Sequence, residues 1–575
     1  MFKKILSGLT IAGLLASLVL PQAHAAPDEQ WVKTPPPTSE PSWGILMAED
    51  TGTQAPIAEL ISVKAENYVG QGGKVLEVKA CKEFTEAECP RDQYQRYATP
   101  LNLCLSEKDG NCVEEVIARD STGSKLAVNF LRNFPEENPY DFAGDVASNL
   151  PDGGTTFLVD IPEAKHEGGS TYLASVVING EKESNSPKFR TTNFNAQLFA
   201  VNLVKGNFNM TRPGLDPAVY TEFRNSNRSG DLQCSIQCSL AEKAVGYSLP
   251  LNIVFGFKLR LAAEVNGWLN GRVSNVESSI SKDSQGRQIV EVVGKPVIVP
   301  VIFGWTTKTE APKALLDFYG AMDPKRAHSG NGFGKCLDPA RVGSAPGPCN
   351  PIYWESTLRN PGKDLESLKE IALWLPLIKD KAVAAPTMWL ISSLGQQFNN
   401  GCAATTDRVS GIVTTNATGY VSGPPEFNRE DQTLDYKVIA AHNLADGTEF
   451  KGTYDLTIDA DFARCIYGFS KAPIGATVSI VSADGQAQVA TVVVSQRDKW
   501  IHLGAYGFTF SSPTLKVKFS QAAESVATPT PTPTPSATAQ PVAAKKTTIT
   551  CVKGKTTKKV TAVKPKCPSG FKKKG

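Results

Sequence analysis

An apolar residue at every second position is the feature that most restricts how this chain can fold. Between residues 248 and 262 the apolar positions are Leu249, Leu251, Ile253, Phe255, Phe257, Leu259 and Leu261. Side chains alternate between the two faces of a strand, whereas the apolar residues of a helix recur every three or four positions. The segment therefore predicts a strand of about 14 residues with one apolar face.

Similar alternation, interrupted by turn signals, extends over most of the chain. Dipeptides that favour hairpin turns occupy 109–110, 179–180, 266–267, 270–271, 285–286, 446–447 and 484–485. Further strands are predicted at 74–80, 172–178, 289–293, 297–303, 433–440, 452–458, 477–482, 489–494, 500–503 and 515–519. This spacing of strands and turns is typical of β-sandwich domains.

One segment has helical periodicity instead. Apolar residues recur at intervals of three and four within 364–377, which predicts an amphipathic helix that ends near Pro376. We expect 388–394 to continue a small helical insert. The predicted fold class is thus mainly β, with several β-sandwich-like domains, this helical insert, a Pro/Thr linker and a short basic tail that contains Cys.

The chain has 575 residues, too many for a single hydrophobic core. We divide it into a signal peptide (1–25), a Pro-rich segment (26–41), a β domain with four Cys (42–190), a β-rich domain with the long strand and the helical insert (191–399), an immunoglobulin-like sandwich (400–521), a Pro/Thr linker (522–544) and a basic tail (545–575). With 41% hydrophobic and 20% charged residues, the composition excludes a membrane-embedded or a wholly disordered protein.

The N-terminus has the three zones of a secretion signal. Lys3 and Lys4 precede an apolar run over 5–20, and a small-residue cleavage site ends at Ala25. The apolar run is shorter than the roughly 20 residues that a membrane-spanning helix needs. We therefore expect a secreted, extracellular or cell-wall-associated protein with no membrane span in the mature chain.

Twelve Cys agree with an oxidising compartment. They are Cys81, Cys89, Cys104, Cys112, Cys234, Cys238, Cys336, Cys349, Cys402, Cys465, Cys551 and Cys567. Zinc sites need paired Cys or Cys/His spacings that are not found in the sequence. The simplest hypothesis pairs sequence neighbours, that is 81 with 89, 104 with 112, 234 with 238, 336 with 349, 402 with 465 and 551 with 567.

Charge is segregated along the chain. The net charge is +3, yet residues 545–575 hold eleven Lys and no Asp or Glu. The part of the chain between the signal and the tail therefore contains 47 basic and 57 acidic residues and is net acidic. The expected polyanion-binding residues of the tail are Lys553, Lys555, Lys558, Lys559, Lys564, Lys566, Lys572, Lys573 and Lys574.

The tail also carries a resemblance. The sequences Cys551-Val552-Lys553-Gly554-Lys555 and Pro565-Lys566-Cys567-Pro568-Ser569-Gly570-Phe571, followed by three Lys, are similar to a C-terminal module of exported actinobacterial proteins. That module usually follows a Pro/Thr-rich linker, as it does here. The resemblance covers about thirty residues and implies export and lineage, but no biochemical activity.

Catalytic motifs are scarce. The four His of the mature chain are too far apart for HExxH or HxH metal sites, and no GxSxG motif occurs, although a Ser-His-Asp triad could still assemble from distant positions. If the protein is an enzyme, Glu355 and Glu264 are the candidate acids, since paired carboxylates catalyse glycoside hydrolysis. Asp459 and Asp461 lie on one side of an expected extended segment and are a candidate calcium site. We expect no other metal or cofactor.

The sequence therefore favours a secreted, envelope-associated protein with a non-catalytic binding or structural function. The expected partner is a cell-wall polyanion or polysaccharide rather than a nucleic acid. Two alternatives stay open. One is an extracellular hydrolase of glycosides or wall polymers, and the other is a pore-forming protein that inserts the apolar strand of 249–261 as a β-hairpin.

Overall fold

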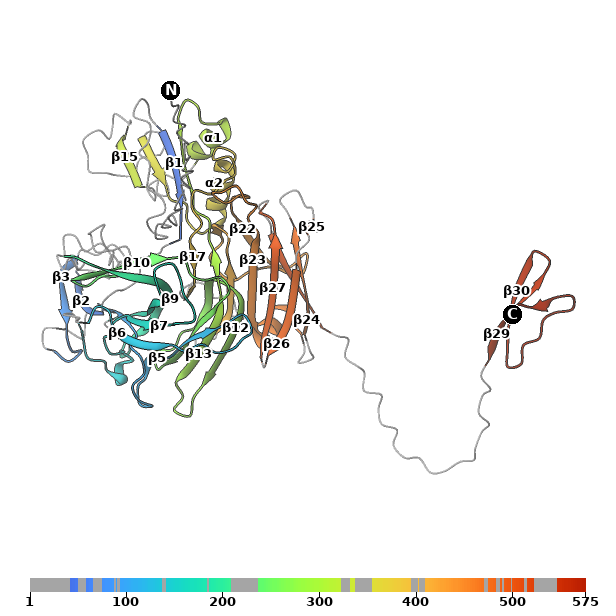
Figure 1. Ribbon diagram of the computed structural model, residues 1–575, viewed down its shortest axis with the longest axis horizontal. Coiled ribbons are helices and arrows are strands. Elements are labelled where there is room, and N and C mark those ends of the chain that lie inside the picture. The colour runs from blue at the N-terminus through green and yellow to red at the C-terminus, as the bar shows by residue number, and fades with distance from the viewer. Residues whose placement is uncertain are drawn as a thin grey trace, which may run out of the picture. The chain divides into compact units, whose positions relative to one another are not determined.

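In the computed structural model the chain forms two compact units, residues 1–522 and 523–575 (Figure 1). The structure describes residues 42–49, 58–65, 75–86, 89, 94–136, 141–183, 186–207, 236–321, 331–336, 354–393, 402, 409–469, 474–481, 487–488, 491–497, 499–510, 514–521 and 546–574. The predicted signal peptide, the Pro-rich segment and the Pro/Thr linker lie outside these residues.

Most strands of the first unit belong to one closed, hydrogen-bonded network. They are β2 (Glu59–Ala65), β3 (Val75–Cys81), β4 (Tyr94–Pro100), β5 (Asn111–Arg119), β6 (Asn129–Asn133), β7 (Phe157–Asp160), β8 (Thr171–Lys182), β9 (Arg190–Lys205), β10 (Glu242–Tyr247), β11 (Val254–Leu261), β12 (Gly267–Lys282), β13 (Gln288–Ile298), β17 (Thr387–Met388), β18 (Leu390–Ser393), β19 (Val409–Thr415), β23 (Gly452–Asp459), β26 (Thr491–Arg497) and β27 (Trp500–Phe508). The mainly β fold class predicted from the sequence is confirmed.

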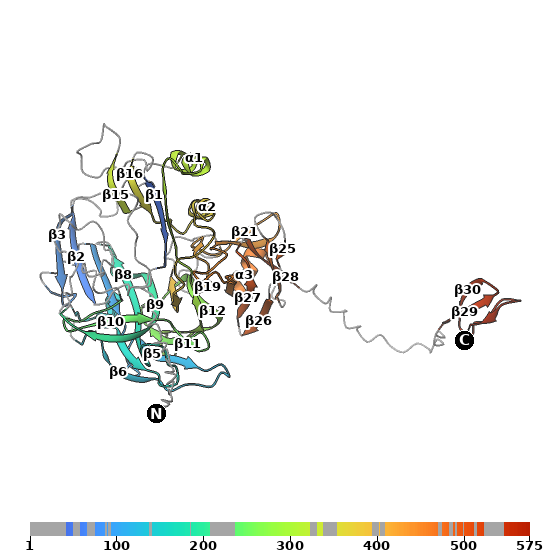
Figure 2. The same cartoon turned by 45° about the horizontal axis from the view of Figure 1, so that its top comes forward.

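Two smaller sheets complete the first unit. One has the order β14-β1-β16-β15, and the other has the order β20-β22-β28-β24-β25, with β21 beside β22. Their strands are β1 (Ser42–Met47), β14 (Ile302–Thr307), β15 (Asn331–Cys336), β16 (Trp354–Arg359), β20 (Gly419–Tyr420), β21 (Glu426–Asn428), β22 (Thr433–Ile439), β24 (Ile474–Val481), β25 (Ala487–Gln488) and β28 (Thr514–Gln521). Figure 2 shows β1, β15 and β16 side by side next to the helices α1 and α2.

Strand β12 changes partners along its length. Its first part pairs with β18 and β19, and its second part pairs with β13. Near the start of the second part, the register with β13 shifts between Ser274 and Glu277, and Asn275 has a φ of 53°. A bulge of this kind bends a strand and lets it pass from one sheet to another.

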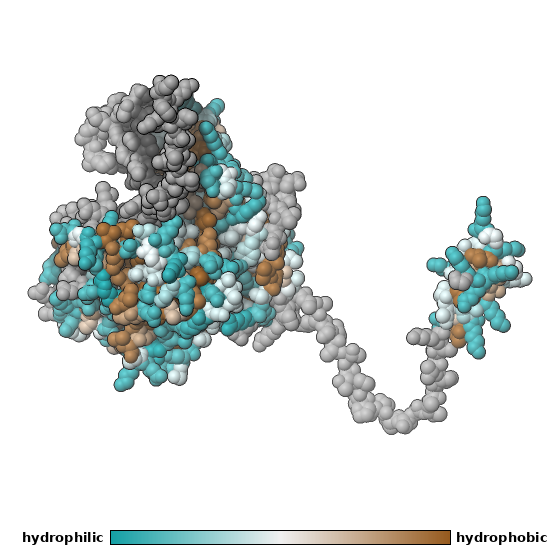
Figure 3. Space-filling view, in the orientation of Figure 1, coloured by the Kyte–Doolittle hydropathy of each residue, from teal (hydrophilic) through white to brown (hydrophobic). Residues whose placement is uncertain are grey.

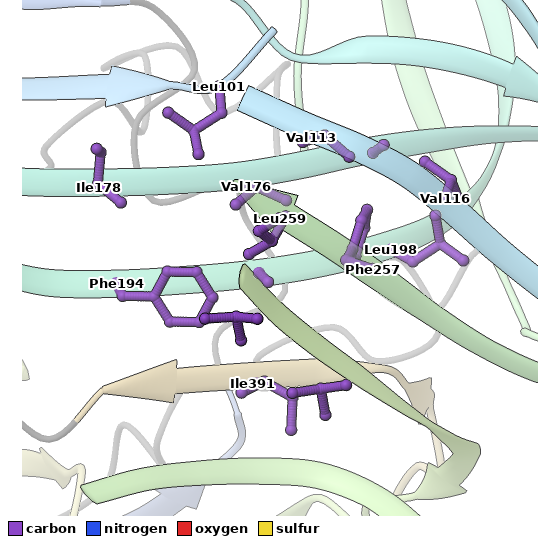
Figure 4. Packing of buried hydrophobic residues seen from close by; sticks show 14 of the residues in the cluster. Leu101, Val113, Val116, Val176, Ile178, Phe194, Leu198, Phe257, Leu259 and Ile391 are labelled. Carbon is purple, nitrogen blue, oxygen red and sulfur yellow. The ribbon is translucent and has the colours of Figure 1, made fainter. Parts of the chain in front are cut away.

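The main core lies between the strands that β12 joins. It includes residues from β5, β8, β9, β11 and β18, and Figure 4 shows Val116, Leu198, Phe257, Leu259 and Ile391 among them. A second core lies between β19, β23 and β27 on one side and β22 and β28 on the other. Two sheets that enclose a common core form a sandwich, as the sequence pattern predicted.

The long strand predicted at 249–261 is shorter than expected. β11 begins at Val254, because Pro250 takes part in a turn in which the Ile253 amide donates to its carbonyl at 3.3 Å. The alternating residues of β11 are nevertheless buried, whereas Leu251 is 44% exposed; the buried set is Phe255, Phe257, Leu259 and Leu261. The alternating pattern identified the buried face of the strand correctly. The pattern also continued through the preceding turn, so the predicted strand was too long.

Three α-helices occur in the described residues: α1 (Lys313–Ala321), α2 (Leu365–Trp374) and α3 (Ala460–Tyr467). The predicted helix is confirmed as α2, whose N-terminus is capped by the Asp364 carboxylate. The expected helical continuation at 388–394 is wrong, because β18 occupies this segment. It pairs with both β9 and β12, so that tertiary pairing overrides an ambiguous short apolar pattern.

Several predicted turns and boundaries differ from the structure. The dipeptides 179–180 and 270–271 lie inside β8 and β12, and the first of them coincides with a shift in register. The dipeptide 484–485 lies outside the described residues. The ranges 42–190, 191–399 and 400–521 do not correspond to separate sheets, because β5 pairs with β11 and β12 pairs with β19.

Four of the six predicted disulfides are present. They join Cys81 to Cys89, Cys104 to Cys112, Cys402 to Cys465 and Cys551 to Cys567. The pairs proposed for Cys234 with Cys238 and for Cys336 with Cys349 fall wholly or partly outside the described residues. Within the part of the chain that the structure describes, no helix is both long and apolar enough to cross a membrane.

Close packing of β12 against β19 predicts a strong effect at Gly411. A Cβ atom at this position would overlap the Trp268 ring, which is 2% exposed and packs edge-on against Phe462. We expect Gly411→Ala to lower the free energy of unfolding by about 1–3 kcal/mol, measured by urea denaturation.

The matched control is Gly320→Ala in α1, where the added methyl group meets open space and alanine favours the helix. Combining Gly411→Ala with Trp268→Leu should cost less than the sum of the two single changes, since the smaller side chain removes the overlap. Additive costs would contradict this account.

Candidate functional site

The second unit is a small basic sheet. It consists of β29 (Thr547–Lys553), β30 (Thr556–Ala562) and β31 (Lys572–Lys573) in the order β30-β29-β31. The disulfide of Cys551 holds the segment before β31, and the Cys551 side chain is fully buried. All nine lysines predicted to bind a polyanion are exposed. Hydrophilic residues accordingly cover much of the visible surface of this unit (Figure 3).

Strand register places several of these lysines on common faces. Lys558 and Lys573 are both opposite Cys551, so they flank it on one face, roughly 10 Å apart across two strand spacings. Lys559 and Lys572 belong to the other face by the same rule. The Lys558 ammonium lies 5.7 Å from the centroid of the Phe571 ring, which is within reach of a cation–π interaction. The fold thus holds like charges close together, an arrangement that an anionic partner would stabilise.

The candidate catalytic carboxylates lie in different parts of the first unit. Glu264 precedes β12 and forms an ion pair of 2.8 Å with Lys282. Glu355 belongs to β16 of the four-stranded sheet, and its side chain is outside the described residues.

Asp459 and Asp461 differ from the expected extended arrangement. Strand β23 ends at Asp459, whose carboxylate caps α3 by accepting hydrogen bonds from the amides of Asp461 and Phe462. Asp461 lies in the first helical turn and pairs with Arg464. The two carboxylates therefore have separate partners, and the extended geometry that suggested calcium is not present.

A buried carboxylate that sequence reasoning missed lies at the bend of β12. Asp455 is 1% exposed and accepts hydrogen bonds from the amides of Asn275 and Val276 at 3.2 and 3.3 Å. The His502 ring lies 2.7 Å from the same carboxylate, and the Tyr506 hydroxyl donates to it at 2.5 Å. Burial and the negative charge of Asp455 raise the pKa of Tyr506 far above its usual value.

The chemistry of this Asp–His pair is mainly structural. The Asp455 carboxylate accepts hydrogen bonds from two backbone amides and the Tyr506 hydroxyl, in addition to its contact with His502. These bonds stabilise the bulge of β12, at which the strand passes between two sheets. Among the described residues, no Ser or Thr hydroxyl is hydrogen-bonded to His502. The alternation Thr453, Asp455, Thr457 predicts a strand with one polar face, but it cannot show that this face is buried.

A second Asp–His pair lies nearer the surface. The His442 ring is 2.5 Å from the Asp380 carboxylate, and both side chains are about one-third exposed. The His442 amide also donates to Asp380, which has a φ of 52°. The contact fixes the chain that follows α2 to the segment that follows β22.

A buried ion cluster lies two residues before the bulge. The Arg272 guanidinium donates to Glu49 at 2.6 Å and to the carbonyl oxygens of Thr415 and Ala417, and Lys363 donates to Glu49 at 2.6 Å. Arg272 also lies over the Tyr420 ring. Burial alone would raise the pKa of Glu49, but ion pairing with Arg272 and Lys363 prevails and lowers it from 4.5 to about 2.

Comparison with known proteins gives no functional lead. No protein-family model matches the chain, and no curated protein has a significantly similar sequence.

The Glu49 cluster predicts a specific acid sensitivity. A lowered carboxyl pKa contributes stability above the unfolded value of 4.5, and this contribution is lost as the pH falls toward 2. We expect a loss of about 3 kcal/mol over this interval, visible as a falling thermal midpoint. Glu49→Gln should have a lower thermal midpoint than the wild type at pH 7, and its midpoint should change less between pH 4.5 and 2. The control Glu107→Gln, which changes an exposed carboxylate, should show the same pH dependence of the midpoint as the wild type. Parallel curves for wild type and Glu49→Gln would refute the assignment.

The hydrogen bonds of Asp455 predict that two variants lose different amounts of stability. Asp455→Asn replaces one of the two buried acceptor oxygens with an NH2 donor that faces a backbone amide of the bulge, so we expect a loss of about 3 kcal/mol in unfolding free energy. Tyr506→Phe removes one donor and should cost about 1 kcal/mol. Urea denaturation measures both variants, and equal costs would show that Asp455 does not hold the bulge.

Proposed function

We propose that this chain is a secreted, envelope-associated binding protein without catalytic activity, and that its second unit attaches it to a polyanion. The observation that carries the proposal is a disulfide-linked sheet with nine exposed lysines, in a segment of 31 residues that has no Asp or Glu. The four described disulfides are compatible with an extracellular location.

Electrostatics explains why the second unit favours anionic polymers. The disulfide and the strand pairing already order the backbone of the second unit, so binding a polyanion orders only the lysine side chains. Each Lys near an anionic surface contributes about 1 kcal/mol. The body between signal and tail is acidic, so attraction to a polyanion is a property of the tail. Wall polymers with phosphodiester groups are the polyanions that a secreted bacterial protein meets first.

The proposal is tested by co-sedimentation of the full mature chain with Gram-positive cell walls. The variant replaces Lys558, Lys559, Lys572 and Lys573 with Ser, and the matched control replaces the exposed body residues Lys64, Lys165, Lys188 and Lys437 with Ser. We expect the tail variant to bind at least tenfold more weakly, the control to bind normally, and wild-type binding to weaken as salt increases.

Two further preparations identify the polymer. Walls stripped of phosphodiester polymers should bind much less protein, whereas vesicles of zwitterionic lipid should bind none. Equal binding by the tail variant and the wild type, with the disulfide of Cys551 intact in both, would overturn the proposal. Sugar release during the incubation would favour the hydrolase alternative instead.

A further inference from the structure

The two faces of the sheet in the second unit are not equivalent. Cys551 belongs to the central strand β29, is fully buried and is bonded to Cys567, so the segment that leads to β31 lies over the face that carries Cys551. Lys558 is directly opposite Cys551 and therefore lies on the same face, where its ammonium is 5.7 Å from the Phe571 ring centroid. We call this the covered face.

The other face of the sheet is open to solvent. Thr550 and Val552 alternate with Cys551 along β29, so their side chains lie on this other face. Both are only half-buried although β29 is the central strand, which shows that no segment packs over them as one does over Cys551. The outer strands and the residue after β31 contribute four exposed residues to the same face, namely Thr557, Lys559, Lys572 and Lys574. We call these six residues the open face.

Threonine hydroxyls lie between the lysines of the open face. Lys559 is opposite Thr550 on one side, and on the other side the Lys574 amide donates to the Thr550 carbonyl at 2.8 Å, which continues the register of β31 by one residue. Two strand spacings, roughly 10 Å, therefore separate the backbones of Lys559 and Lys574. Further along this face, the hydroxyls of Thr548 and Thr561 are 2.6 Å apart. Positive charges thus alternate with groups that both donate and accept hydrogen bonds.

We infer that the open face binds a phosphodiester polymer whose charges are separated by hydroxylated units, that is, a polyol phosphate or sugar phosphate chain. This inference rests on the proposed function, since it names the surface and the ligand chemistry by which the second unit attaches. The lysines supply counter-charges for successive phosphates, and the threonines between them match the neutral hydroxylated units. None of the six residues is aromatic and only Val552 is apolar, so this face lacks the large apolar side chains that enter a lipid surface.

Charge on the covered face contributes little to this contact. Lys553, Lys558 and Lys573 share the face of Cys551, and the side chains of Lys553 and Lys558 lie against Gly570 and Phe571 of the covering segment. A polymer on the open face is farther from their ammonium groups than the Debye length, about 8 Å at physiological salt. Three lysines on each face carry the same charge, so replacing one set or the other separates recognition by a surface from attraction by net charge.

The test compares the two sets of lysines in the full mature chain. The open-face variant replaces Lys559, Lys572 and Lys574 with Ser, and the covered-face variant replaces Lys553, Lys558 and Lys573 with Ser. Isothermal titration at physiological salt measures binding of purified poly(glycerol phosphate), and mass spectrometry checks that the disulfide of Cys551 is intact. We expect the open-face variant to bind at least tenfold more weakly and the covered-face variant to stay within about threefold of the wild type.

A second pair of variants removes hydroxyl groups without changing the charge. Thr550→Val together with Thr557→Val keeps the β-branched shape of both side chains on the open face. We expect this double variant to bind the polymer about fivefold more weakly, because two hydrogen-bonding groups are lost. The matched control, Thr547→Val together with Thr556→Val, changes exposed residues on the side of Cys551 and should bind as the wild type does.

The possible results separate this inference from the proposed function. Equal weakening by the two lysine sets, or unchanged binding by the open-face threonine variant, would overturn the inference and leave attachment by net charge in place. Unchanged binding by both lysine sets would overturn both proposals. Vesicles of phosphatidylglycerol present the glycerol phosphate group on a lipid surface, so binding to them that equals or exceeds binding to the polymer at equal phosphate concentration would overturn the assignment to a polymer.

Discussion

Two buried charges fix the position at which strand β12 passes from one sheet to the next. Arg272, where β12 stops pairing with β18, donates to Glu49 and to the carbonyl oxygens of Thr415, the last residue of β19, and Ala417. Three and four residues further along β12, the amides of Asn275 and Val276 in the bulge donate to Asp455. Through its first part β12 connects to β9 and β23, and through its second part it connects to β11 and β5. The bend therefore lies between the strands that line the two largest cores of the first unit.

The sequence predicted where strands begin and end better than it predicted which strands pair with one another. Alternation located β22, β23 and β28 almost at their observed bounds, because one face of each packs in a core. It could not show that β12 would join distant parts of the chain, since pairing partners are chosen by tertiary packing. Asn270-Gly271 illustrates the limit: the dipeptide favours a turn, but the surrounding sheet keeps it in a strand.

Prediction of the candidate sites was limited in the same way. Lysines without neighbouring acids predict an exposed basic surface, because charge of one sign is stable only in water or beside a counter-charge. Asp455 and Glu49 carry no such signal. Their importance arises from burial, and burial of a polar face depends on what packs over it, which a strand's own sequence does not specify.

The pairing of β1 has a consequence for the order in which the chain can fold. Ser42 lies opposite Thr307 on one side and Ser356 on the other, so the first described strand must await residues from much later in the chain. Contacts of such long sequence separation form slowly. The four-stranded sheet therefore cannot close until residues of β16 are available, whereas local pairs such as β7 with β8 and β8 with β9 need no later part of the chain.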